Sequence, residues 1–156
     1  MSAALIDRFY SSFARRDAAD MAACYAPDAS FSDPVFRELR GAQVPAMWRM
    51  LCERGADLAV TYRDVASDGA TGSAHWEATY TFTQTGRKVH NRIDARFTFK
   101  DGLIATHVDS FGLWRWTRMA LGTPGLVLGW SPLVQNKVRD QAMKGLSLFM
   151  KRHRLG

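Results

Sequence analysis

The period of the hydrophobic pattern changes at Leu58, and this change limits the possible folds more than any other feature of the chain. Four runs follow in which apolar and polar residues alternate: LAVTYRDVAS, TGSAHWEATYTFTQ, VHNRIDARFTFK and LIATHVDSF. Such alternation is typical of strands that bury one face. The turn signals between them, SDGATG, TGRK and KDG, favour tight connections. We therefore expect four consecutive antiparallel strands in a meander.

The residues before Leu58 have the pattern of helices. Residues 2–16 predict an amphipathic helix, because apolar residues recur at helical spacing. Asp17 is placed to cap a second short helix that ends at Cys24, and residues 42–53 predict a third helix with Pro45 in its first turn. Three helices followed by a curved antiparallel sheet form an α+β fold. We expect the first helix to lie across the sheet and close one end of a cone, which leaves a mouth at the other end.

One carboxylate lies inside the apolar hexapeptide FSDPVF, residues 31–36. Burying an unpaired charge costs several kcal/mol or shifts the pKa of the group. The residue before a proline is pushed toward extended backbone, so Asp33 should lie at the end of a short strand. Two interpretations remain open. Asp33 is either a turn residue whose side chain caps its own backbone, or a base held in a dry pocket.

Length and composition are those of an ordinary globular domain. A chain of 156 residues with 47% hydrophobic and 23% charged residues fits a single core that buries about two thirds of the unfolded surface. The N-terminus lacks the pattern of a secretory signal, and no apolar run reaches about 18 residues. We therefore expect a cytoplasmic protein. Cys24 and Cys52 show no metal-ligand spacing, and we expect both to be buried, reduced thiols.

The net charge of +6 is concentrated at the C-terminal end. Residues 1–112 carry 13 Lys and Arg against 14 Asp and Glu, whereas residues 113–156 carry 8 against 1. We expect a cone domain over residues 1–118 and a basic extension over residues 119–156. In the latter, LWRWTRMAL predicts a turn or two of helix, GTPGLVLGWSP a loop, and residues 132–151 a last helix.

Three roles are open for this basic helix. It packs on its own body or across a dimer, or it attaches to an anionic membrane through Trp130, Phe149 and its lysines. Nucleic-acid binding is the third role and the least favoured, because no basic platform with interleaved aromatic residues is present. An antiparallel sheet with a mixed outer face also suggests a homodimer.

The order of elements, with LIDRFYSSFARRD, FSDPVF, NRIDARFTFKDG and HVDSFGLWRW, resembles the nuclear transport factor 2-like superfamily. Within it, residues 2 to about 118 are most similar to the SnoaL-like branch, which is related to ketosteroid isomerase and to limonene epoxide hydrolase. The resemblance implies a cone-shaped, strongly curved sheet wrapped around N-terminal helices. It implies much less about activity, because one fold hosts many functions.

The resemblance to ketosteroid isomerase implies roles for two aspartates. Asp33 matches the catalytic base, and Asp94 matches an aspartic acid that stays protonated and donates a hydrogen bond to an enolate; the isomerase is a worked example of this chemistry. The tyrosine of that family falls on Phe9, and Tyr10 lies about 100° further around the helix. Steroid isomerisation is therefore not favoured.

Asp109 matches the inward aspartate of the cyclase and hydrolase branches. The hydrolases pair it with an Arg-x-Asp motif on the strand that here reads HWEATY, where no such motif occurs. Epoxide hydrolysis is therefore less favoured. A cyclase needs one acid or base over an acidic C–H, and Asp109 with His107 could supply it. Their spacing of two places both on one face of a strand. A structural hydrogen-bonding role for His107 is the alternative.

The direction of Asp94 is open. Simple alternation places it opposite Ile93, Phe97 and Phe99, facing solvent together with Arg92. A β-bulge near Ala95 would turn it inward. Arg92 could also pair with Asp94 and lower its pKa, which would remove the neutral-acid role.

Two functions follow from these residues. The first is a cofactor-free, metal-free enzyme of the isomerase or cyclase type, acting by proton transfer on a hydrophobic, polyketide-like or steroid-like carbonyl compound. The second is a non-catalytic module that binds an apolar ligand. The catalytic candidates are Asp33, Asp94, Asp109 and His107, and the side chains expected to line the pocket are Phe9, Trp48, Trp76, Tyr80, Phe82, Arg92 and Phe111.

Overall fold

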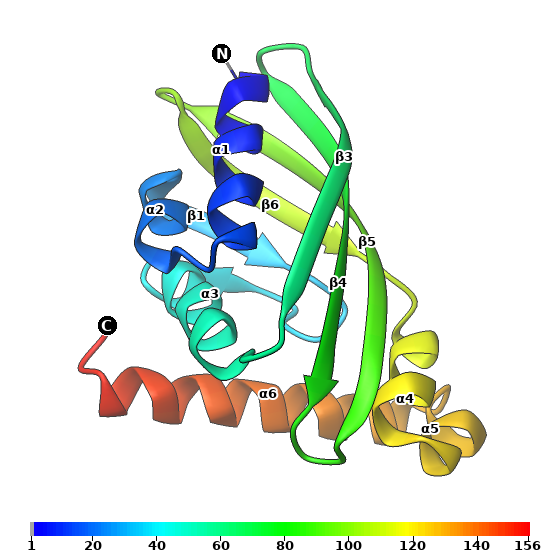
Figure 1. Ribbon diagram of the computed structural model, residues 1–156. Coiled ribbons are helices and arrows are strands. Elements are labelled where there is room, and N and C mark those ends of the chain that lie inside the picture. The colour runs from blue at the N-terminus through cyan, green and yellow to red at the C-terminus, as the bar shows by residue number, and fades with distance from the viewer. Residues whose placement is uncertain (1) are drawn as a thin grey trace.

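The structure is a computed structural model that describes residues 2–156, and one strongly curved, six-stranded sheet forms its frame (Figure 1). The strand order is β2-β1-β6-β5-β4-β3. The last four strands in sequence, β3 (Ala59–Ser67), β4 (Thr71–Phe82), β5 (Arg87–Lys100) and β6 (Leu103–Ser110), form the antiparallel meander that the sequence predicts. The α+β fold is thereby confirmed.

Three helices lie inside the curve of the sheet: α1 (Ser2–Ala14), α2 (Ala18–Ala23) and α3 (Gln43–Arg54) (Figure 1). The Asp17 side chain accepts a hydrogen bond from the Asp20 N–H at 3.1 Å and caps α2, as expected. Helix α1 crosses β3 and β4, so it is covered by the sheet on one side and by the aromatic interior on the other. The cone is therefore closed at this end.

Two short strands complete the sheet. Strand β1 (Tyr25–Ser32) runs parallel to β6, whereas β2 (Leu39–Arg40) is antiparallel to β1. The β1–β6 register places Phe31 beside His107. The extended segment before Asp33 was expected, but its parallel pairing was not. Asp33 lies directly after the end of β1, as the sequence predicts.

The interior of the cone is filled mainly by aromatic side chains. Trp48 packs edge-on against Phe9, Phe13 and Phe31, at ring-centroid distances of 5.5, 5.1 and 5.3 Å. Edge-to-face pairs of this kind add to the free energy gained by burying their large apolar surfaces. The largest side chains with almost no exposed surface are Trp48, Tyr10, Phe9, Phe13, Phe31 and Phe97.

The C-terminal region forms three helices: α4 (Leu113–Leu121), α5 (Thr123–Leu128) and α6 (Pro132–Arg152). Helix α5 falls where the sequence predicts a loop. Pro124 stands in its first turn, where a proline favours helix initiation. Helix α6 runs across the lower end of the molecule beneath α3 (Figure 1). The division at residue 118 stays a prediction, and α6 adds Leu146 and Phe149 to the main core.

Contacts at both ends hold α6 to the body. Arg139 Nε donates a hydrogen bond to the Pro34 carbonyl at 2.8 Å, which ties the helix to the turn after Asp33. Near the other end, the guanidinium groups of Arg49 and Arg54 lie 5.9 and 5.8 Å from the Phe149 ring centre. Within residues 2–156, no helix combines the length and apolar character that crossing a bilayer requires.

Candidate functional site

A continuous chain of hydrogen bonds crosses the aromatic interior. Trp48 Nε1–H donates to the Tyr25 hydroxyl at 2.8 Å, and that hydroxyl lies 2.7 Å from His107 Nδ1. His107 Nε2 lies 2.8 Å from Asp109 Oδ1, which also accepts a hydrogen bond from Trp76 Nε1–H at 3.3 Å. Buried polar groups are costly unless paired, and this chain pairs them one after another.

One arrangement of protons satisfies the whole chain with His107 neutral. The Tyr25 oxygen accepts from Trp48, so its hydroxyl hydrogen can point to His107 Nδ1. His107 then carries its proton on Nε2 and donates a hydrogen bond to Asp109 Oδ1. The opposite tautomer leaves the Tyr25 hydroxyl hydrogen without an acceptor in this chain. We therefore assign the first arrangement.

The network uses only one oxygen of Asp109. His107 and Trp76 both donate to Oδ1, and no donor among residues 2–156 hydrogen-bonds to Oδ2. The residue is 3% exposed, and it lies next to Phe111 at the end of β6. A carboxylate oriented through one oxygen and open at the other has the form of a general base.

Asp33 combines the two roles that the sequence left as alternatives. Its Oδ1 accepts hydrogen bonds from the backbone N–H groups of Val35 and Phe36 at 2.7 and 2.6 Å, so it does cap the turn. The residue is nevertheless half-buried. Burial raises the pKa of its carboxyl to about 7, against the hydrogen bonds from Phe36 and Val35 and with a further increase from the charge of Asp109.

Tyr10 is a functional candidate that sequence reasoning set aside, because it lies about 100° around the helix from the family position. Both Phe9 and Tyr10 are fully buried, because α1 is covered on two sides. The Tyr10 hydroxyl is the one fully buried side-chain polar atom among the described residues without a hydrogen-bond partner. Burial raises its pKa well above the usual value, and the nearby charge of Asp109 raises it further. The available signal was the width of the apolar stripe on α1, which includes both positions.

The structure places Asp94 away from these groups, on the outer face of the sheet. Its side chain is 80% exposed and accepts from His75 Nδ1 at 2.9 Å. Strands β4 and β5 pair without interruption from Thr71↔Thr98 to Phe82↔Arg87, so there is no bulge near Ala95 between them. Simple alternation applies, which corrects the inward placement that the family resemblance implied.

Arg92 shares this outer position and does not line the interior. Its Nε lies 3.8 Å from Glu77 Oε1, which also accepts from His90 Nε2 at 2.6 Å. These hydrogen bonds hold the pKa of Glu77 at about 2, with His75 making the largest contribution. No group of three His, Cys, Asp or Glu side chains in residues 2–156 is arranged to hold a metal ion.

The other expected pocket residues divide into two sets. Phe9, Trp48 and Trp76 belong to the main core around His107. Phe82 packs on a second cluster that includes Trp116 of α4, and Tyr80 and Phe111 pack on both clusters. Trp116 Nε1–H donates to the Tyr80 hydroxyl at 2.7 Å. Burial raises the pKa of Tyr80, against the hydrogen bond from Trp116.

Two surface hollows lie elsewhere. One of about 300 Å³ is lined by the start of α1 and Gly102, and one of about 720 Å³ is lined by residues of β3 to β6 that include Arg96 and Val108. Neither includes Asp33 or Asp109. Aromatic side chains occupy the space next to these two aspartates, so a ligand would have to displace some of them.

Comparison with known proteins identifies the family of the chain. The family model described as a SnoaL-like domain matches residues 6–107. A search of curated protein sequences gave no significant match.

Solved structures share the fold at low sequence identity. One is a nuclear transport factor 2-like protein of unknown function from Burkholderia pseudomallei, 20% identical with a TM-score of 0.65 over 74% of this chain and 93% of that one. A candidate polyketide cyclase from Xanthomonas campestris is 21% identical with a TM-score of 0.62 over 74% and 93%. A protein with a ketosteroid isomerase-like fold from Catenulispora acidiphila, in complex with trimethylamine, is 12% identical with a TM-score of 0.67 over 82% and 97%.

Proposed function

The chain belongs to the SnoaL-like domain family, and from that premise we propose that it binds a hydrophobic carbonyl compound and moves a proton on it. One observation carries this proposal. Asp109 is a buried carboxylate whose Oδ1 is held by His107 and Trp76, while its other oxygen accepts no hydrogen bond from residues 2–156. A carboxylate oriented in this way has the form of a general base.

In the proposed reaction Asp109 is the base. Its open oxygen, Oδ2, takes a proton from a C–H next to the substrate carbonyl, and the electron pair of that bond moves to form an enolate. His107 and Trp76 hold Oδ1 and thereby position the carboxylate. Asp33, whose pKa of about 7 leaves it about half protonated at neutral pH and largely protonated in mildly acidic solution, returns a proton to another carbon. Proton exchange between the carboxyl groups and water restores the starting state.

The enolate oxygen needs a hydrogen-bond donor, and Tyr10 can supply one. Its hydroxyl is buried, has no partner and lies within range of the charge of Asp109. A single donor to a developing oxyanion lowers the activation free energy by about 3 to 4 kcal/mol. The role that the resemblance implied for Asp94 passes in this proposal to a tyrosine next to the family position.

Proton abstraction can be tested without the natural substrate. The probe is a hydrophobic cyclic ketone with a single carbonyl group, whose uncatalysed exchange in neutral D₂O is slow, and the measurement is deuterium incorporation at the carbon next to that carbonyl by NMR. We expect Asp109→Asn to reduce the enzymatic exchange rate by about 10² to 10⁴-fold. Asp33→Asn should leave the first abstraction largely intact but stop transfer of the proton to a second carbon in an unsaturated ketone.

Asp94→Asn is the matched control, because it makes the same chemical change on the outer face. Exchange should be unaffected in this variant. If Asp109→Asn exchanges the probe as fast as the unchanged protein, Asp109 is not the base and this mechanism is wrong.

A non-catalytic binding module is the second candidate function. One observation favours it: the position that the resemblance gives to the family's tyrosine is Phe9, which has no hydroxyl to donate and is fully buried. This candidate predicts that apolar aromatic ketones bind, measured by quenching of tryptophan fluorescence, with no deuterium exchange above the background rate. Both candidates place the ligand in the same interior. The expected homodimer stays a prediction under either.

A further inference from the structure

We propose that the corner formed by α4, α5 and α6 docks on an anionic lipid surface. The apolar corner is defined by six exposed side chains, Trp114, Leu126, Val127, Leu128, Trp130 and Leu133. This inference is independent of the proposed catalytic function, because it uses none of the residues that carry it.

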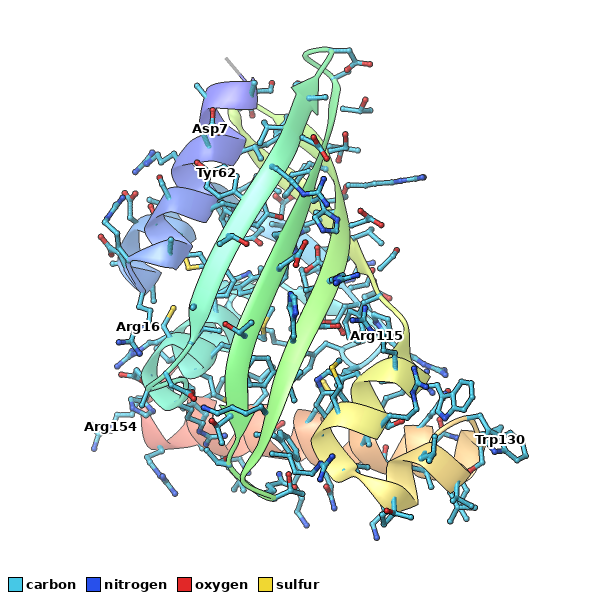
Figure 2. All side chains as sticks on the ribbon, turned by 45° about the vertical axis from the view of Figure 1, so that its right-hand side comes forward. Asp7, Arg16, Tyr62, Arg115, Trp130 and Arg154 are labelled. Atoms are coloured by element: carbon cyan, nitrogen blue, oxygen red, sulfur yellow. The ribbon has the colours of Figure 1, made fainter. Side chains whose placement is uncertain are left out.

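The apolar corner is unusually exposed for side chains of this size. Trp130 is 63% exposed and Leu133 is 81% exposed, and the other four lie between 43% and 57%. Figure 2 shows Trp130 projecting away from the body of the molecule beside α5. Contiguous exposed apolar side chains of this kind mark an interaction surface rather than the scattered exposure that is normal for a monomer.

The backbone beneath these side chains is already hydrogen-bonded within the protein. The carbonyls of Gly125 and Leu128 accept from the Gly129 and Ser131 N–H groups, both at 2.9 Å. The Gly129 carbonyl accepts from Gln135 Nε2 at 3.0 Å. An apolar medium offers no partner to exposed backbone groups, so a segment that enters it must satisfy its carbonyls internally.

The two tryptophans complete this pattern. Trp114 Nε1–H donates to the Leu126 carbonyl at 3.2 Å, and Trp130 Nε1–H donates to the Val127 carbonyl at 2.8 Å. Five consecutive carbonyls, from Gly125 to Gly129, therefore have partners. Both indole rings can be buried in lipid without losing a hydrogen bond, and tryptophan is enriched at the boundary between lipid and water.

Positive charge flanks the apolar corner. Residues 119–136 contain no charged side chain, and the segment is bounded by Arg118 and Lys137. The Arg118 guanidinium lies 5.0 Å from the Trp114 ring centre, and Arg115 lies in the same helix. An apolar tip bordered by basic side chains is the arrangement that binds anionic lipid, through apolar burial together with attraction to the head groups.

A second copy of the chain fits this corner less well. Two corners brought together would place Arg115, Arg118 and Lys137 of one copy near those of the other, and like charges repel. The carbonyl groups of Leu126 and Val127 in α5 also already accept hydrogen bonds from the two indole N–H groups, so they are weaker acceptors for a protein partner. A lipid surface needs neither shape complementarity nor an acceptor.

The test is flotation of the full chain with vesicles of phosphatidylcholine alone or of phosphatidylcholine with an equal part of phosphatidylglycerol. We expect binding to the anionic vesicles at low ionic strength and weaker binding as salt is added. Trp130→Gln combined with Leu133→Gln should weaken binding by about tenfold or more. Arg118→Gln combined with Lys137→Gln should weaken it by about fivefold for each charge removed.

Matched control variants distinguish binding through the corner from non-specific binding to vesicles. Leu148 is 54% exposed at the far end of α6, and Lys100 is an exposed lysine on the sheet, so Leu148→Gln and Lys100→Gln should bind as the unchanged protein does. Absence of flotation at low ionic strength, or equal flotation of the corner variants, would overturn the proposal. Self-association in sedimentation velocity that the corner variants abolish would also overturn it, because the corner would then bind a second copy. Retention of the protein on immobilised polyglutamate without flotation would overturn it as well.

Discussion

Asp33 shows why one residue can satisfy two interpretations that looked like alternatives. Its Oδ1 caps the turn through Val35 and Phe36, and the other oxygen accepts no hydrogen bond from residues 2–156. Capping the turn therefore leaves one oxygen of the Asp33 carboxyl free to take part in proton transfer. The hydrogen bonds orient it, and burial keeps its pKa near neutrality.

The raised pKa of Asp33 predicts a dependence of stability on pH. Below the usual value of 3.8 the carboxyl is neutral in both the folded and the unfolded chain. As pH rises toward about 7, only the unfolded chain loses the proton, so the free energy of unfolding falls. Asp33→Asn stays neutral and keeps an oxygen for the turn. We expect it to raise this free energy above pH 7 by up to about 4 kcal/mol, with almost no gain near pH 4.

Urea denaturation at a series of pH values measures this effect. Asp28→Asn is the control, because Asp28 is exposed on β1, the strand that ends just before Asp33. A gain for Asp33→Asn that does not change with pH would contradict the assigned pKa shift.

Tyr10 and Tyr25 make a matched pair of buried hydroxyls. The Tyr10 hydroxyl has no partner, so Tyr10→Phe should raise the free energy of unfolding by about 1 kcal/mol. The Tyr25 hydroxyl bridges Trp48 and His107, so Tyr25→Phe should lower it by about 1 to 3 kcal/mol. Denaturation of both variants measures the two signs. If Tyr10→Phe also slows deuterium exchange, the Tyr10 hydroxyl acts on the bound ligand and not on stability. If the variant instead lowers the free energy of unfolding, the hydroxyl already has a hydrogen-bond partner, such as water.

At the scale of elements, local pattern predicted most of what is observed. The four long strands, the three N-terminal helices and the helix over residues 113–121 lie where periodicity and caps place them. The parallel pairing of β1 with β6 could not be predicted in this way. It joins Tyr25 to His107 across 82 residues of sequence, and no local signal records that contact.

The candidate site follows the same division. Alternation predicted that His107 and Asp109 share a face, and it also gave the outward direction that Asp94 has. The family resemblance pointed the other way for Asp94, and the regular register of β4 with β5 decides between them. Sequence reasoning set Tyr10 aside because of its angle from Phe9, but a helix buried on two sides has a wider apolar face than a single stripe suggests, and both residues are buried.

Helix α6 offers a prediction that compares two leucines of one element. Leu146 is 1% exposed and belongs to the main core, whereas Leu148 is 54% exposed. We expect Leu146→Ala to lower the free energy of unfolding by about 2 to 5 kcal/mol, because it leaves a cavity, and Leu148→Ala to change it by less than about 0.5 kcal/mol. Thermal denaturation measures both. Similar values for the two variants would show that α6 does not pack on the core as described.

At the scale of the whole molecule, charge and chemistry occupy different parts of the chain. Residues 1–112 are nearly neutral and contain the buried hydrogen-bond chain, whereas residues 113–156 carry the positive charge and the apolar corner. Helix α6 connects the two parts, since it holds the turn after Asp33 through Arg139 at one end of its packed length and reaches α3 at the other.

This separation predicts that the two activities can be removed one at a time. Asp109→Asn should lose deuterium exchange and still float with anionic vesicles, because Asp109 is buried and its hydrogen-bond partners, His107 and Trp76, are not part of the corner. Trp130→Gln with Leu133→Gln should lose flotation and keep the exchange of the ketone probe in solution. Both assays on both variants complete the test. If the corner variant also loses exchange while its denaturation curve is unchanged, the corner controls entry to the interior, and the two parts act as one device.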